Sequence, residues 1–184
     1  MRILSLDISS SCIGWALFEE NDGDAQLVTY GHIKPPKKEK GSLSFRLKKT
    51  EDELRKIIDK YAPKQVAIED YAKRFSMGRS TANTIIMLSV FNEVLTLLCF
   101  KEIGSDPYRY PVVTIRSCVG KHFGQKIVSK DDIFPAISSK ANIFLTRQNK
   151  KGNLAKECFD EGDAIAVGMT HLLKTNQNLK SLSI

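Results

Sequence analysis

Short apolar runs separated by polar turn residues fill the first part of the chain. Residues 2–8 run up to an acid, residues 12–18 form a second apolar run after the serines at 9–11, and residues 26–33 form a third after the turn signal at 21–24. Apolar runs of this length between turn residues are typical of β-strands. The pattern predicts three consecutive strands, antiparallel after the first turn.

A helical pattern follows an exposed basic loop over residues 34–41, where two adjacent prolines exclude regular structure. From Ser42 onward, apolar residues recur at intervals of three, four and seven through a charged background, namely at Leu43, Leu47, Leu54, Ile57 and Ile58. The proline after Ala62 ends this predicted helix. Residues 65–69 predict a fourth strand, which is short and apolar and also ends at an acid.

Residues 80–102 form the longest apolar stretch, and apolar side chains surround this predicted helix instead of striping it. A helix that is apolar all round needs cover on every side, either in a core or in a partner subunit. Asn92 and Glu93 in its middle, and short uninterrupted apolar stretches, argue against a membrane span. Burial within one subunit and a homodimer interface are therefore both open.

The second half of the chain predicts one more strand and two more helices. Residues 111–115 predict a fifth strand, followed by a basic segment over residues 116–130 and a helix from about residue 129 to residue 144. A second basic loop spans residues 147–153, and the last helix starts near Asp160. We expect the order βββαβαβαα, with a five-stranded mixed sheet flanked by helices.

Composition limits the class of protein. The 184 residues are the size of one α/β domain, so we expect residues 1–184 to form a single domain. With 42% hydrophobic and 27% charged residues, the chain is neither a disordered nor a membrane protein by composition. Lys and Arg number 28 against 21 Asp and Glu, a net charge of +7. Nucleic acid is the leading candidate partner, and a solvated lysine-rich surface is the alternative.

The cysteines and the start of the chain indicate a reducing compartment. Cys12, Cys99, Cys118 and Cys158 are far apart and show no CxxC pairing, so we expect reduced thiols instead of a zinc site or a disulfide framework. The chain begins directly with a strand and lacks the features of a signal peptide. A cytoplasmic location is expected, at the nucleoid or in the cytoplasm of an infected host.

Four acids occupy coherent positions in the predicted elements. Asp7 ends the first strand, Glu69 ends the fourth, and Asp160 and Asp163 share one face of the last helix. If the two strands are neighbours, the four carboxylates converge, and their mutual repulsion requires cations. Hard oxygen ligands suit Mg²⁺ or Mn²⁺, and two such ions can activate a water and stabilise a leaving oxygen in phosphodiester cleavage. The alternative is that each acid is a turn or cap residue, with Asp160 as an N-cap.

Three segments, residues 4–16, 66–69 and 160–168, resemble the acidic motifs of RuvC-type Holliday junction resolvases, which belong to the retroviral-integrase/ribonuclease H-like superfamily. The similarity spans nearly the whole chain in order and spacing. It includes residues 115–120, which look like the family's strand-to-helix turn with a basic residue.

The resemblance implies a ribonuclease H-like fold and a Mg²⁺-dependent, structure-selective endodeoxyribonuclease. A homodimer of this family cuts two opposed strands of a four-way DNA junction, and helix 80–102 corresponds to the family's dimer interface. The resemblance implies that four residues are catalytic metal ligands: Asp7, Glu69, Asp160 and Asp163.

The resemblance also implies two groups of DNA contacts. Family members place basic residues near the site, and here the candidates are Arg116 and Lys130, with Lys121 and Lys126 as rivals. The loop after the second acid presents an aromatic that stacks on DNA bases, a contact that tolerates any sequence. In this chain the loop candidates are Tyr71, Lys73, Arg74, Phe75 and Arg79.

Other functions share these features. Transposases, ribonuclease H enzymes and nuclease domains of larger effectors have the same fold and acids, so a nuclease for other branched DNA is the first alternative. An actin-like phosphotransferase has a similar first hairpin, but the chain lacks a second nucleotide-binding lobe. A non-catalytic DNA-binding homologue is a third alternative, against which the presence of all four acids argues.

Overall fold

The computed structural model of the chain describes residues 1–71, 82–140, 148–149, 151–176 and 179–184. Its strands form one six-stranded mixed sheet in the order β5-β4-β1-β2-β3-β6. The strands are β1 (Arg2–Ile8), β2 (Ile13–Asn21), β3 (Asp24–Ile33), β4 (Gln65–Asp70), β5 (Tyr108–Pro111) and β6 (Ser181–Ser183). The helices are η1 (Lys38–Lys40), α1 (Leu43–Tyr61), α2 (Ala82–Ile103), α3 (Val112–Phe123), α4 (Lys130–Lys140) and α5 (Glu157–Thr175).

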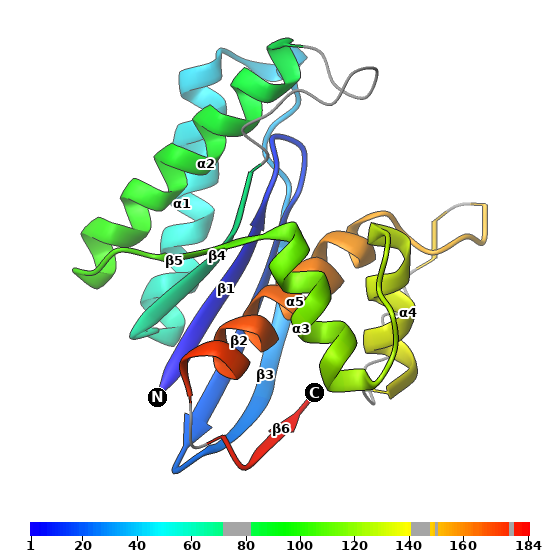
Figure 1. Cartoon of the computed structure of the whole chain (residues 1–184). Helices are drawn as coiled ribbons and strands as arrows, with labels where there is room; N and C mark the ends of the chain where they lie inside the picture. The colour runs from blue at the N-terminus through cyan, green and yellow to red at the C-terminus, as the bar shows by residue number, and fades with distance from the viewer. Residues whose placement is uncertain (72–81, 141–147, 150, 177–178) are drawn as a thin grey trace.

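Helices cover both faces of this sheet (Figure 1). On one face α1 and α2 lie side by side, and on the other α5 crosses the sheet, with α3 and α4 packed against it. β1, β2 and β3 are antiparallel neighbours, whereas β4 runs parallel to β1. The predicted α/β class with a mixed sheet and flanking helices is therefore confirmed.

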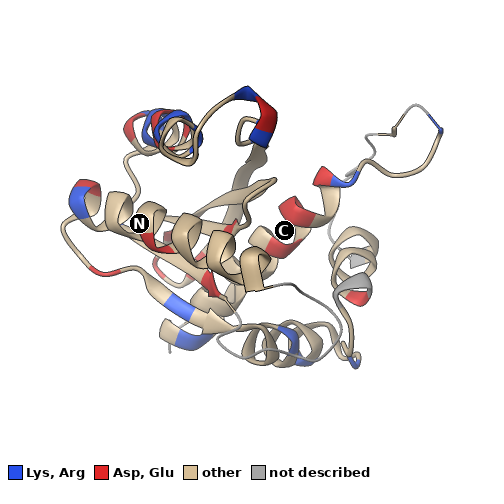
Figure 2. Cartoon of the chain, turned by 90° about the horizontal axis from the view of Figure 1, so that it is seen from above, with Lys and Arg blue, Asp and Glu red and all other residues tan. Residues whose placement is uncertain are grey.

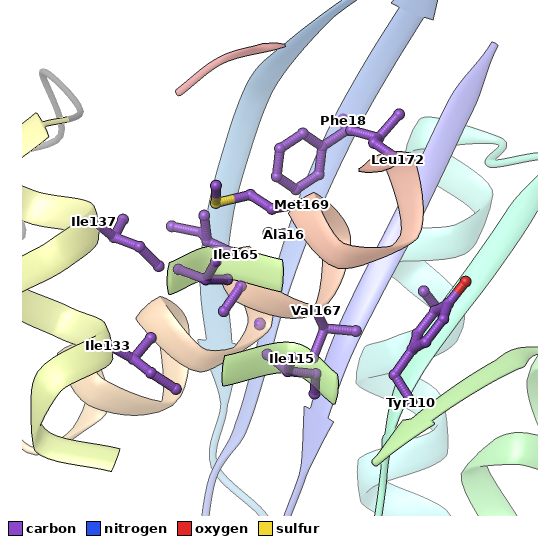
Figure 3. Packing of buried hydrophobic residues seen from close by; sticks show 14 of the residues in the cluster. Ala16, Phe18, Tyr110, Ile115, Ile133, Ile137, Ile165, Val167, Met169 and Leu172 are labelled. Atoms are coloured by element: carbon purple, nitrogen blue, oxygen red, sulfur yellow. The ribbon is translucent and has the colours of Figure 1, made fainter. Parts of the chain in front are cut away.

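Alternation along the central strand determines which residues meet α5. Leu4, Leu6 and Ile8 belong to the core under α1 and α2, whereas Ile3 belongs to the core under α5, which Figure 3 shows at close range. Successive strand residues point to opposite faces, so Asp7 lies on the same side as Ile3. The sheet thus presents this acid to α5.

The first helix and the strands around it match their predictions. Ser42 is the N-cap of α1, where its side chain accepts a hydrogen bond from the Phe45 backbone N–H, and Ala62 ends the helix in the left-handed conformation before a proline. The first three strands and β4 also lie where the apolar runs predicted them. The hydrophobic pattern was sufficient here because each run is bounded by strong turn residues.

Three predictions about the second half were wrong. The sheet has six strands instead of five, because β6 pairs with the start of β3. The predicted fifth strand over residues 111–115 is mostly helix: β5 ends at Pro111 and α3 begins at Val112. Residues 115–120, expected as a strand-to-helix turn, lie inside α3. The β-branched residues favoured a strand, but Ile115 and Val119 are buried one helical turn apart.

A buried histidine links α5 to the sheet. His171 is completely buried, and its Nδ1 accepts a hydrogen bond from the Tyr110 hydroxyl at 3.0 Å while Nε2 donates to Gln65 Oε1 at 2.8 Å. Burial lowers the pKa of His171 to about 4. The imidazole is therefore neutral at neutral pH and serves as a polar anchor within the core.

Candidate metal centre

Three of the four predicted acids form one cluster. Asp7, Asp160 and Asp163 each offer a carboxylate oxygen, and these oxygen atoms all lie within 4.8 Å of one another. Asp7 is 8% exposed and Asp163 is 4% exposed. Three carboxylates this close and this buried repel one another unless a cation lies between them, so the donor set fits a divalent ion.

The two aspartates of the helix lie in its first turns, and α5 begins at the end of the sheet where β1 ends (Figure 1). α5 begins at Glu157, with Lys156 at the N-cap position and no side-chain cap hydrogen bond. The interpretation of Asp160 as an N-cap is therefore wrong. Its position three residues before Asp163 directs both carboxylates toward Asp7.

Close backbone packing brings this helix to the sheet. Gly14 lies opposite Asp7 in the β1–β2 register, and a Cβ built on Gly14 would be 1.9 Å from the Asp160 carbonyl oxygen. The Ser5 hydroxyl is 2.7 Å from the Ala164 carbonyl oxygen, to which it donates a hydrogen bond. Because Gly14 has no side chain and Ser5 donates this hydrogen bond, the start of α5 lies against Asp7.

Glu69 lies beside the cluster but is not one of its three members. The parallel register pairs Leu6 with Ile68, so the next residues, Asp7 and Glu69, are neighbours on adjacent strands. Ala67 packs in the core under α5, and strand alternation puts Glu69 on that same side. Its role as a fourth ligand stays a prediction.

A cysteine borders the cluster without offering a thiolate. Burial raises the pKa of the Cys12 thiol, and the nearby Asp160 carboxylate raises it further through its charge and a hydrogen bond. Cys12 therefore stays protonated at neutral pH. The ligands that the described residues offer at this point are carboxylate oxygens, which favour Mg²⁺ or Mn²⁺ over softer metals.

Two contacts that α5 makes with the end of β3 and the residue after it were not predicted from the sequence. His32 Nδ1 lies 2.7 Å from Oε1 of Glu161, whose side chain is completely buried, and Lys34 forms an ion pair with Glu157. The hydrophobic pattern of a helix does not reveal that a single glutamate is buried, so neither acid was singled out from the sequence. The two acids are one helical turn apart on α5, but their partners are distant in sequence, so no local pattern indicated either contact.

The residues predicted to contact DNA lie in different parts of the structure, and some fall outside the described residues. Arg116, Lys121 and Lys126 line one hollow of about 430 Å³, and Arg116 Nη1 donates to the Val128 carbonyl at 3.0 Å. Tyr71 is half-buried just after β4, and Lys130 is the first residue of α4. Four of the predicted residues lie outside the described residues: Lys73, Arg74, Phe75 and Arg79.

α2 keeps part of its apolar surface exposed, notably at Ile86, Leu97 and Phe100. By length and composition it is the one described helix that could cross a membrane, and 28% of its most apolar window is buried. One such helix is weak evidence for a membrane span. Glu93, in its middle, forms an ion pair with Arg109 at 2.8 Å, so a protein interface fits this helix better than lipid.

Known proteins resemble this chain over most of its length. The family model for crossover junction endodeoxyribonuclease RuvC matches residues 3–171. The crossover junction endodeoxyribonuclease RuvC of Xanthomonas euvesicatoria pv. vesicatoria is 27% identical over 171 residues, which cover 92% of this chain and 86% of the relative. Its counterpart from Sorangium cellulosum is 26% identical over 175 residues, with 94% and 84% covered.

Solved structures show the same fold. T. thermophilus RuvC in complex with a Holliday junction substrate matches with a TM-score of 0.69 and 12% identity, covering 94% of each chain. The yeast mitochondrial Holliday junction resolvase matches with a TM-score of 0.62 and 12% identity, covering 93% of this chain and 77% of the resolvase.

Proposed function

Because the chain belongs to the RuvC family of crossover junction endodeoxyribonucleases, we propose that it resolves four-way (Holliday) DNA junctions by paired, metal-dependent hydrolysis of phosphodiester bonds. The observation that carries this proposal is the carboxylate cluster of Asp7, Asp160 and Asp163. The cluster lies within the matched segment, at the end of the central strand where the family resemblance predicts the metal ligands. We also propose a cytoplasmic location, as the sequence led us to expect.

We propose Mg²⁺ as the natural ion, replaceable by Mn²⁺, with two ions at each site. Asp7, Asp160 and Asp163 would hold them, and Glu69 on the adjacent strand would complete the ligand set. When bound, a pair of such ions activates a water and stabilises the leaving oxygen of a phosphodiester.

The protein's own residues prepare this site for the substrate. Asp7 is held by a central strand and the two helical acids by α5, so the three carboxylates are positioned before DNA arrives. The contacts of His32 with Glu161 and of Lys34 with Glu157 fix the first two turns of α5 to the end of β3 and the residue after it. Because packed elements fix the site, little of the binding energy of DNA is needed to order it.

We propose a homodimer formed through α2, because two opposed strands require two symmetric sites. Ile86, Leu97 and Phe100 are 58%, 51% and 43% exposed, a surface that a second copy would cover. Light scattering at micromolar concentration is expected to give twice the chain mass of 20.7 kDa. Leu97→Glu with Phe100→Glu should give a monomer, whereas Val28→Glu on β3 should leave the dimer intact. A wild-type monomer would contradict the dimer.

The substrate is tested by offering four-way, three-way, flap and linear duplex DNA with Mg²⁺. We expect selective binding and symmetric paired nicks on the four-way junction, and no cleavage of any substrate in EDTA. Equal cleavage of flaps and three-way junctions would replace the proposal by a broader branched-DNA nuclease. Binding without cleavage under any divalent ion would show a non-catalytic DNA-binding protein.

A further inference from the structure

A hollow lined by lysines is separate from the DNA contacts predicted above. Its volume is about 560 Å³, and it lies between the loop after β3 and the first turns of α1. The residues that matter in its lining are four lysines and one exposed aromatic, namely Lys34, Lys37, Lys40, Lys49 and Phe45.

Three of these lysines keep their charge available. Elsewhere on α1, Lys48 is paired with Asp52 and Lys56 with Glu53, so those charges are compensated locally. By contrast, Lys37, Lys40 and Lys49 are exposed and form no ion pair within the part of the chain that the structure describes. Glu53 also lines the hollow, but its charge is compensated by the ion pair with Lys56. The hollow therefore carries uncompensated positive charge.

The loop that carries two of these lysines is fixed in place by a buried guanidinium. Arg46 is 8% exposed, and it donates from Nε to the Pro36 carbonyl and from Nη2 to the Ser10 carbonyl, each at 2.7 Å. Ser10 belongs to the turn that follows Asp7 at the end of β1. Arg46 therefore ties the basic loop to the turn next to the metal centre.

The fourth lysine connects the hollow to α5. Lys34 forms an ion pair with Glu157, three residues before Asp160. The hollow and the carboxylate cluster thus lie at the same end of the sheet, the end that faces the viewer in Figure 2. A polyanion that binds at the metal centre would therefore also come close to the hollow.

We propose that Lys37, Lys40 and Lys49 bind the phosphate backbone of a duplex arm of the DNA substrate. The proposal rests on the proposed function and adds a second contact region to it. Lysine ammonium groups recognise phosphates as point charges without reading sequence, and each contact releases counterions. The Lys49 ammonium lies 6.0 Å from the centre of the Phe45 ring, which helps to hold it over the hollow.

The test measures binding of a four-way junction, without a divalent ion so that no cleavage occurs, over a range of salt concentrations. The variant Lys37→Gln/Lys40→Gln/Lys49→Gln is compared with Lys64→Gln/Lys174→Gln/Lys180→Gln, which removes the same charge from exposed lysines at the far end of the sheet. We expect the first variant to bind about tenfold more weakly or worse at physiological ionic strength, with the salt slope reduced by roughly 0.9 for each lost contact. The control should bind as wild type does.

Two further measurements complete the test. The corresponding triple Lys→Arg variant keeps the charge and should restore binding, and shortening the junction arms should weaken wild type but not the Gln variant. Equal losses in both Gln variants, or no loss in the first, would overturn the proposal. Its failure is distinct from that of the proposed function, since wild type would then still bind and cleave four-way junctions selectively.

Discussion

Asp163→Asn is expected to abolish Mg²⁺-dependent junction cleavage, a loss on the order of a thousandfold or more, while junction binding stays close to that of wild type. The amide has the same shape as the carboxylate but offers one neutral oxygen to the ion. Asp163 is 4% exposed and belongs to the three-carboxylate cluster, so its substitution removes one carboxylate from the proposed ligand set. Removing one negative charge near the DNA phosphates does not weaken binding.

Metal binding gives an independent readout for the same variant. Mg²⁺ should raise the melting temperature of wild type, because an ion that binds the folded state stabilises it, and should raise that of Asp163→Asn much less. Without metal the variant should be at least as stable as wild type, since one repulsive charge is gone. Asp59→Asn on the exposed surface of α1 is the control and should keep both activity and the response to Mg²⁺. Full activity of Asp163→Asn would refute the site.

The sequence contained enough information for most of the metal centre. Asp7 follows from a strand that ends at an acid, and Asp160 and Asp163 follow from their spacing on a helix, because these periodicities are local properties of the backbone. The family membership that the resemblance implied is confirmed by the match over residues 3–171. Local patterns thus singled out the three acids that the fold brings together.

Features that depend on tertiary packing were not predictable in the same way. β6 consists of Ser181–Ser183, too short and polar to resemble a strand, and it forms because the edge of β3 is available. The run from Val112 to Ile115 has β-branched residues that favour a strand, but packing against α5 stabilises a helix. The ion pair between Lys34 and Glu157 joins residues distant in sequence, so no local pattern could indicate it.

Gly14 is the clearest case of a residue whose role appears only in three dimensions. In the sequence it is one small residue within an apolar run, and nothing distinguishes it from a strand glycine that merely weakens a sheet. In the structure the backbones of β2 and α5 approach each other closely at this residue. Its lack of a side chain is what allows the helix to bring its acids to Asp7.

Gly14→Ala is therefore expected to reduce cleavage on the order of a hundredfold or more, although residue 14 offers no ligand. The added methyl group would lie 1.9 Å from the Asp160 carbonyl oxygen and 2.4 Å from its carbon, so the backbone of α5 must move away from β2. This displacement separates Asp160 and Asp163 from Asp7. It should also cost about 1–3 kcal/mol of unfolding free energy, as overpacking usually does.

Gly162→Ala is the matched control, because it adds the same methyl group between the two ligands of α5. There the nearest atom is a Phe134 ring carbon at 3.4 Å, an ordinary van der Waals contact, and alanine favours a helix over glycine by up to about 1 kcal/mol. Cleavage and the Mg²⁺-induced rise in melting temperature should survive Gly162→Ala and be lost in Gly14→Ala. If Gly14→Ala, folded by circular dichroism, cleaved junctions as wild type does, the cluster would not depend on this close approach, because the helix would have another way to reach Asp7.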